Sequence, residues 1–113
     1  MISGIGVDIC SVDRIAELIE RRPKVVQKLF TEAEAERPVA SLAARFAAKE
    51  ALVKALGSSD GLAWLEIEVV NDEAGKPCFV FFGTTARTIG ERRVHLSLSH
   101  DAGMAIAMVV VEC

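Results

Sequence analysis

Residues 45–57 read RFAAKEALVKALG and belong to the most strongly helical segment of the chain, which we expect to span Ser41 to Leu56. Alanine occupies several positions of this segment, so other groups can approach the helix closely. Gly57 follows at the position where a helix C-cap belongs. Four larger apolar residues recur at helical spacing and predict the apolar stripe of the helix: Leu42, Phe46, Val53 and Leu56.

The residues before this helix predict one strand and three short helical segments. Ile2–Ile9 is mostly apolar, contains two glycines and predicts a buried strand. A helix is expected over Val12–Glu20, with Ser11 as its N-cap. A short helical piece follows at Lys24–Phe30, and Thr31 begins a T-x-x-E capping box that starts another short helix.

The second half of the chain alternates apolar and polar residues, which is typical of strands. Between two of these strands, Thr84–Gly90 predicts a short helix that is capped by Thr84. Helices early in the chain and antiparallel strands late indicate a single α+β domain over residues 1–113. The expected strands are Leu65–Val69, Pro77–Phe82, Val94–Ser99 and Met104–Val111.

Composition excludes several classes of protein. The chain of 113 residues is 51% hydrophobic and carries a net charge of -3, which argues against bulk nucleic-acid binding. No apolar run reaches the roughly 20 residues of a membrane helix, and we expect no signal peptide because the N-terminus lacks a basic region. The three cysteines are far apart in the sequence, which favours a reducing cytoplasm.

Three residues have side chains suited to metal and phosphate chemistry. Asp8 ends a strand beside Gly4 and Gly6, where a carboxylate and close backbone suit a hard cation. The alternative is an aspartate that only caps the following helix. Glu50 and Lys54 are four residues apart and share one helix face, which suits a metal next to a diphosphate. A simple surface ion pair is the alternative interpretation.

Ser97–Asp101 contains serine, histidine and aspartate in one short run. Consecutive residues cannot form a catalytic triad, because triad members are assembled from distant segments. A hydroxyl and an imidazole at a strand end can instead hydrogen-bond a phosphate, and an ordinary polar turn is the alternative.

Three segments in the same order resemble the signature blocks of the holo-acyl-carrier-protein synthase family, the short single-domain 4′-phosphopantetheinyl transferases. They are GIGVDI at 4–9, RFAAKEALVKALG at 45–57 and LSLSHD at 96–101, and together they span nearly the whole chain. The F-x-x-K-E-A-x-x-K pattern of the second block is the most specific of them. The turn at 75–77, Gly-Lys-Pro, also resembles that of the family.

The resemblance implies a reaction, a fold and an assembly. The family transfers 4′-phosphopantetheine from coenzyme A to a serine of apo acyl carrier protein or of a carrier domain in fatty acid biosynthesis. Adenosine 3′,5′-bisphosphate is released, and the reaction requires Mg²⁺, for which Mn²⁺ often substitutes. The implied fold has a long helix packed on a small antiparallel sheet. Its short members are homotrimers with active sites between adjacent subunits.

The resemblance also implies roles for individual residues. Asp8 and Glu50 would be metal ligands, and Lys54 would face the pyrophosphate, so these three would form the catalytic centre. Ser99 and His100 would face the 3′-phosphate of coenzyme A across a subunit interface. Glu50, acting directly or through a metal-bound water, is the candidate base for the serine hydroxyl. Longer members have a D-x-E pattern, and Cys10 takes the place of its glutamate here. Water would therefore complete the coordination of the metal. Further phosphate candidates are Arg45, Lys49 and Lys76.

Carrier proteins of this class are acidic around the modified serine, so a basic surface is expected to receive them. Arg14 matches a basic position with which the family holds the carrier. The positive residues that follow could equally form a solvated basic face. A non-catalytic trimeric module that binds a nucleotide or a partner is the alternative function. The carrier-binding candidates are Arg14, Arg21, Arg22, Lys24 and Lys28.

Overall fold

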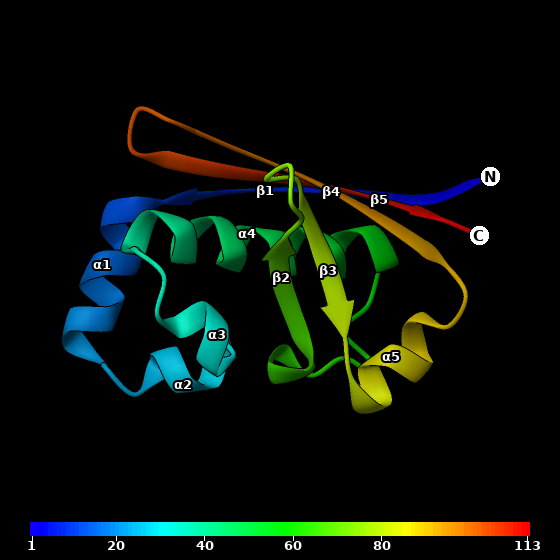
Figure 1. Ribbon diagram of the computed structural model, residues 1–113, viewed down its shortest axis with the longest axis horizontal. Coiled ribbons are helices and arrows are strands. Elements are labelled where there is room, and N and C mark those ends of the chain that lie inside the picture. The colour runs from blue at the N-terminus through cyan, green and yellow to red at the C-terminus, as the bar shows by residue number, and fades with distance from the viewer.

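Helix α4 (Val39–Leu56) lies at the centre of this computed structural model, which describes residues 1–113 (Figure 1). It packs against one face of a three-stranded antiparallel sheet with the strand order β1-β5-β4. Both termini lie at one end of this sheet, where the amide of Cys113 donates to the carbonyl of Met1. The predicted α+β class is confirmed. The strands are β1 (Ile2–Ser11), β4 (Arg93–Asp101) and β5 (Met104–Glu112).

Small residues bring α4 unusually close to the sheet. A Cβ atom at Gly4 or Gly6 would overlap the carbonyl oxygen of Ala55 or Ala51, so both glycines of β1 lie against the helix backbone. The sequence suggested that these glycines allow a ligand to approach the backbone. That interpretation is wrong, because the space that a side chain would need is filled by α4.

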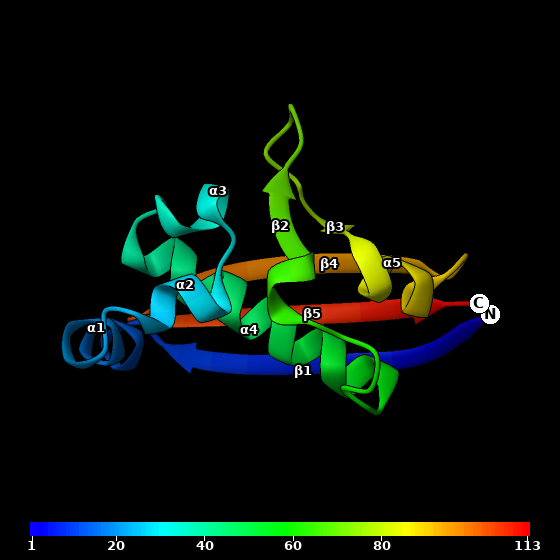
Figure 2. The same cartoon turned by 90° about the horizontal axis from the view of Figure 1, so that it is seen from below.

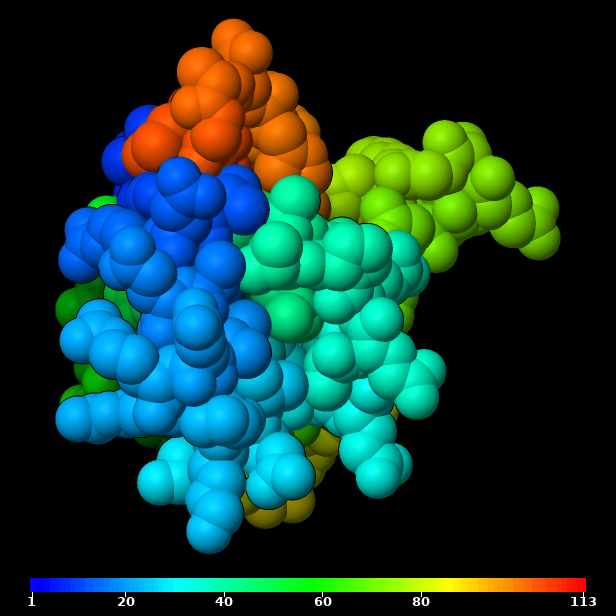
Figure 3. Space-filling view, turned by 90° about the vertical axis from the view of Figure 1, so that its left-hand side faces the viewer, coloured from blue at the N-terminus to red at the C-terminus, as the bar shows by residue number.

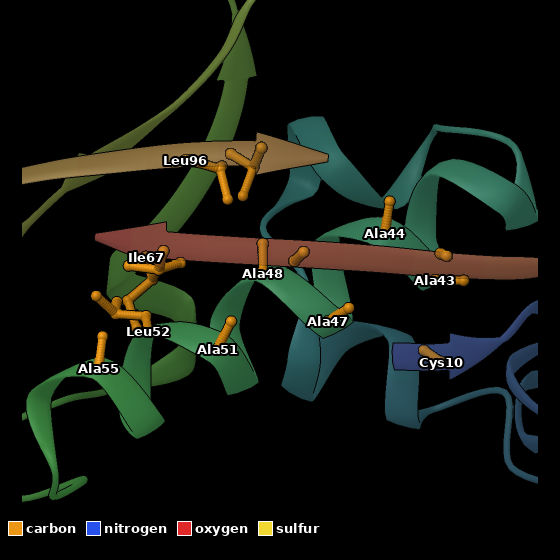
Figure 4. Packing of buried hydrophobic residues seen from close by; sticks show 14 of the residues in the cluster. Cys10, Ala43, Ala44, Ala47, Ala48, Ala51, Leu52, Ala55, Ile67 and Leu96 are labelled. Carbon is orange, nitrogen blue, oxygen red and sulfur yellow. The ribbon is translucent and has the colours of Figure 1, made fainter. Parts of the chain in front are cut away.

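The buried face of α4 consists mainly of alanines, together with Leu42 and Leu52 (Figure 4). The predicted stripe is therefore only partly correct, because Phe46, Val53 and Leu56 are half-buried. The helix is covered on several sides, by the sheet and by the elements below it, so no single narrow stripe marks its buried face. Its C-terminus agrees with prediction, since Gly57 has a φ of 82°.

Three short helices connect β1 to α4: α1 (Val12–Arg21), α2 (Val25–Leu29) and α3 (Glu32–Ala35). The Ser11 side chain accepts a hydrogen bond from the Arg14 amide and caps α1 as predicted. The predicted capping box is also present, because Thr31 and Glu34 each accept a hydrogen bond from the other's backbone amide.

A second, two-stranded sheet of β2 (Ile67–Asn71) and β3 (Pro77–Phe81) forms a hairpin that projects from the body of the molecule (Figure 2). A 3-10 turn (Trp64–Glu66) takes the place of the expected start of β2. Helix α5 (Gly83–Ile89) follows β3.

The predicted cap of α5 is wrong, because Thr84 lies inside the helix and Phe82 is the N-cap residue. The amide of Thr85 donates instead to the carboxylate of Glu66, at 3.0 Å. This carboxylate comes from the 3-10 turn before β2, so local sequence around Thr84 does not reveal it. Hydrogen bonds from Thr85 lower the pKa of Glu66.

The face of the β1-β5-β4 sheet that points away from α4 carries no other element (Figure 1). The sequence predicted a buried first strand, yet only alternate residues of β1 are covered. We call the uncovered surface the bare face. Its apolar side chains are 40–58% exposed and belong to Ile5, Val7, Ile9, Ile106 and Met108. None of the helices combines the length and apolar composition needed to cross a membrane.

Candidate functional site

Asp8 and Glu50 line one cavity of about 390 Å³ that is bounded by β1, α1 and α4. Strand alternation puts Asp8 on the side of β1 that faces α4, as it does Gly6. Glu50 lies in the fourth turn of α4, and both carboxylates are half-buried. Two distant parts of the sequence thus bring two acidic side chains to one hollow, as predicted.

Lys54 contacts one of these two acids, Asp8. Its Nζ donates to Oδ1 of Asp8 and to the carbonyl oxygen of Val7, both at 3.0 Å. Lys54 follows Glu50 by about one helical turn, so it emerges on the same side of α4. Glu50 itself makes no side-chain hydrogen bond or ion pair, and its carboxylate remains free to bind a ligand.

The donor set fits a hard divalent cation. Carboxylate oxygens are the protein ligands that Mg²⁺ prefers, and it commonly uses one or two of them with water and substrate phosphates. No group of three His, Cys, Asp or Glu side chains could hold a metal ion, so the chain supplies at most two carboxylates here, and Glu17 lines the cavity beside Asp8 and Glu50. Cys10 lines the same cavity, but burial raises the pKa of its thiol, as does the nearby Asp8.

Arg45 lies in the interior beside the β2–β3 hairpin. Its guanidinium donates to Ser41 Oγ and to Asn71 Oδ1, both at 3.0 Å. Its Nε is buried without a hydrogen-bond partner, and burial lowers the pKa of the guanidinium. The unpaired Nε has almost no accessible surface, so it does not support a phosphate contact by itself.

Lys49 does not fit the predicted phosphate role. It is fully buried, and its ammonium donates to Glu34 Oε1 (2.7 Å), to the Leu29 carbonyl (2.9 Å) and to the Trp64 carbonyl (3.2 Å). An ammonium has three protons to donate, so none is left for a phosphate. Burial lowers the pKa of Lys49, and the ion pair with Glu34 opposes this effect.

Glu34 is the residue whose importance the sequence analysis missed. Besides capping α3, its carboxylate accepts from the amide of Val69 (2.8 Å) and pairs with Lys49 in the interior. The T-x-x-E pattern identified the capping role but gave no signal of the buried partner.

Ser99, His100 and Lys76 lie outside the cavity of Asp8 and Glu50. His100 lines a separate hollow with Asp13 and the β4–β5 turn, and Ser99 is exposed just before it on β4. Lys76 is exposed in the turn of the β2–β3 hairpin. This hairpin projects from the surface of the molecule (Figure 3). The fold of one chain does not bring these predicted phosphate ligands to the acids.

The predicted carrier-binding residues are all exposed, and they divide into two groups. Arg14 and Arg21 line the cavity of Asp8 and Glu50 from α1. The other three, which surround the corner between α1 and α2, are Arg22, Lys24 and Lys28.

Comparison with known proteins gives a consistent result. The model of the 4′-phosphopantetheinyl transferase superfamily matches residues 4–109. A holo-acyl-carrier-protein synthase of Clavibacter michiganensis is 54% identical over 99% of this chain and 97% of its own length. The crystal structure of the Neisseria meningitidis holo-acyl-carrier-protein synthase has a TM-score of 0.92, with 35% identity and 100% of both chains covered. That of the Helicobacter pylori enzyme, in complex with coenzyme A, has a TM-score of 0.85 with 32% identity, covering 96% of this chain and 99% of the other.

The family match includes the segments that carry Asp8, Glu50 and Lys54, and the structural matches cover almost every residue. The resemblance seen in the three sequence blocks is thus confirmed over the full length. The chain belongs to the 4′-phosphopantetheinyl transferase superfamily.

Proposed function

We propose that this protein transfers 4′-phosphopantetheine from coenzyme A to a serine of an acyl carrier protein and releases adenosine 3′,5′-bisphosphate. The observation that carries this function is that Asp8 and Glu50 line one cavity and that Lys54 pairs with Asp8 at 3.0 Å. Full-length similarity to holo-acyl-carrier-protein synthases supports the same activity. On the strength of this similarity we place the transfer in fatty acid biosynthesis.

The residues of the chain divide the chemistry between them. Asp8 and Glu50 would hold Mg²⁺, which neutralises charge on the pyrophosphate when it is bound. Lys54 offsets the negative charge that grows on the bisphosphate leaving group. Glu50, whose carboxylate has no side-chain partner, accepts the proton of the attacking serine hydroxyl.

We propose that the working enzyme is a homotrimer with a site between adjacent subunits. The bare face supports this assembly, because an apolar surface of this kind is usually covered by another protein surface. Ser99 and His100 would then reach the 3′-phosphate of a coenzyme A molecule bound at the neighbour's Asp8 and Glu50. Of the further phosphate candidates, Lys76 is exposed and available for such a contact, whereas Arg45 is buried within its own chain.

The carrier protein docks on α1 and the corner that follows it. Arg14 and Arg21 lie at the cavity, so an acidic partner bound there would present its serine to Glu50. Arg22, Lys24 and Lys28 extend the positive surface and would steer the encounter. We place the reaction in the cytoplasm, because all three cysteine thiols are unpaired in the fold.

The test is incubation of the purified protein with coenzyme A, Mg²⁺ and an apo acyl carrier protein, read as the mass increase of the carrier. We expect Asp8→Asn and Glu50→Gln each to lower turnover by about 100-fold or more, because each removes a charged group aimed at the reaction centre. Glu20→Gln on the exposed side of α1 is the control and should retain wild-type turnover.

Two outcomes would overturn this assignment. Turnover near wild type in both variants at saturating Mg²⁺ would remove Asp8 and Glu50 from the metal site. Binding of coenzyme A by the wild-type protein without any mass increase of the carrier would support a non-catalytic nucleotide-binding module instead.

A further inference from the structure

Asp8, Glu50 and Lys54 are not equivalent in the absence of ligands. Asp8 has a cationic partner from its own chain, because Lys54 Nζ lies 3.0 Å from Oδ1. Glu50, one turn earlier on α4, has no such partner. One carboxylate of the metal site is therefore already neutralised before any ligand binds, and the other is not.

The contact between Lys54 and Asp8 can be broken at small cost. The Lys54 side chain is 54% exposed, and Asp8 is 18% exposed, so water screens their attraction. A lysine ammonium ends a flexible four-carbon stem and can move without displacing the backbone. Its second acceptor, the Val7 carbonyl, belongs to the β1 backbone beside Asp8.

A divalent cation and the Lys54 ammonium compete for the same carboxylate. Two like charges within a few ångströms of one another repel, so a cation bound at Asp8 disfavours the ammonium in its present position. A released ammonium near a bound dication needs an anion to stabilise it there. The pyrophosphate of coenzyme A supplies negative charge for both the divalent cation and the Lys54 ammonium.

We propose that Lys54 is a resident counter-ion of Asp8 that couples the binding of divalent metal to the binding of coenzyme A. In the free chain, Lys54 weakens metal binding by occupying Asp8. When the pyrophosphate is present, Lys54 moves to it and leaves the carboxylate to the metal. Because such coupling is reciprocal, the metal strengthens coenzyme A binding by the same factor. This inference rests on the proposed function for the identity of the second ligand.

The test measures Mn²⁺ binding by the loss of the free-ion electron paramagnetic resonance signal, with and without coenzyme A, and needs no turnover. For the wild-type protein we expect coenzyme A to tighten Mn²⁺ binding. Lys54→Met should bind Mn²⁺ alone about two- to fivefold more tightly, the range that an exposed ion pair usually contributes. It should also show a smaller tightening by coenzyme A. Lys54→Arg keeps the charge and should resemble the wild-type protein without coenzyme A.

Lys28→Met is the matched control, because it removes one exposed positive charge that has no acidic partner. We expect it to leave Mn²⁺ binding unchanged. Equal tightening in Lys28→Met and Lys54→Met would overturn the proposal, since net charge alone would then explain the effect. So would an unchanged Mn²⁺ affinity in Lys54→Met, or no Mn²⁺ binding by any of these proteins.

The two proposals fail separately. If the wild-type protein modifies the carrier but coenzyme A does not tighten its binding of Mn²⁺, only the role of Lys54 is contradicted. Wild-type protein that shows the coupling but leaves the carrier unmodified would contradict only the transfer reaction.

Discussion

At the scale of single residues, Lys49 and Glu50 are adjacent in the sequence and have opposite environments. Lys49 points into the interior and meets Glu34, whereas Glu50 lines the cavity with Asp8. A helix turns each side chain by about 100° from the previous one, so neighbours in one motif face different surroundings. In this motif the lysine therefore belongs to an interior ion pair, and the glutamate that follows it belongs to the site.

The first residue-scale prediction concerns Glu34→Gln. This change leaves the buried ammonium of Lys49 without its counter-charge, and removing one partner of a buried ion pair costs about 3 kcal/mol or more. Urea unfolding should show this loss. Glu32→Gln, on the exposed side of the same helix, should stay within about 0.5 kcal/mol of the wild-type protein. A Glu34→Gln protein as stable as Glu32→Gln would mean that the pair contributes nothing to stability.

Sequence reasoning recovered the residues of the site better than those of the interior. The spacing of Glu50 and Lys54 predicted a shared helix face. Asp8 was expected at the end of a strand with its carboxylate in a cleft; it lies inside β1, which continues to Ser11, and its half-buried carboxylate lines the cavity. Glu34 lies 15 residues before Lys49 and reaches it only because α2 and α3 turn the chain back on α4. That contact depends on tertiary packing, and no local pattern encodes it.

At the scale of elements, the position of α4 depends on two glycines in β1 and the alanines opposite them. Nearly every predicted helix and strand is present, and most boundaries differ by only one or two residues. The sequence did not reveal which faces are buried, because alanine gives a weak periodic signal and an apolar strand residue can face either side. The cap of α5 was missed because Glu66 supplies it from 19 residues before Thr85.

The element-scale prediction is that Gly6→Ala destabilises the protein by about 3 kcal/mol or more. The new methyl group would collide with backbone atoms of Ala51 and Ala55, and backbone cannot move aside as a flexible side chain does. The free energy of unfolding in urea measures the effect. Gly75→Ala is the control: it has open space around it but a φ of 85°, so it should cost about 1 kcal/mol. Equal losses in the two variants would contradict close packing as the cause.

At the scale of the whole molecule, α4 covers one face of the three-stranded sheet and leaves the bare face uncovered (Figure 1). Val7 on β1 is paired with Met108 on β5, and Ile9 is paired with Ile106, so apolar side chains form rows across two strands. An apolar surface arranged in this way fits another copy of the chain better than it fits water. The same assembly would bring Ser99 and His100 to a site that they do not reach within one chain.

The whole-molecule prediction is that Met108→Asp prevents the trimer without unfolding the chain. Met108 is 47% exposed, so a carboxylate there remains hydrated in the isolated subunit and changes its stability little. Covering the same carboxylate with an apolar partner costs several kcal/mol unless the partner offers a hydrogen bond. Light scattering should report a trimer for the wild-type protein and a monomer for the variant. Val80→Asp changes an exposed apolar strand residue outside the bare face and should remain trimeric.

The activity of the Met108→Asp monomer then tests whether the site is shared between subunits. If Ser99 and His100 serve a neighbour's Asp8 and Glu50, the monomer should lose most of its transfer activity, and full activity would contradict the shared site. Mixing two variant chains tests whether one site uses residues of two subunits. His100→Ala and Glu50→Gln chains are each impaired alone, but some sites in a mixed trimer combine an intact Glu50 with an intact His100. Partial recovery of turnover on mixing is therefore expected only if the two residues act across the interface.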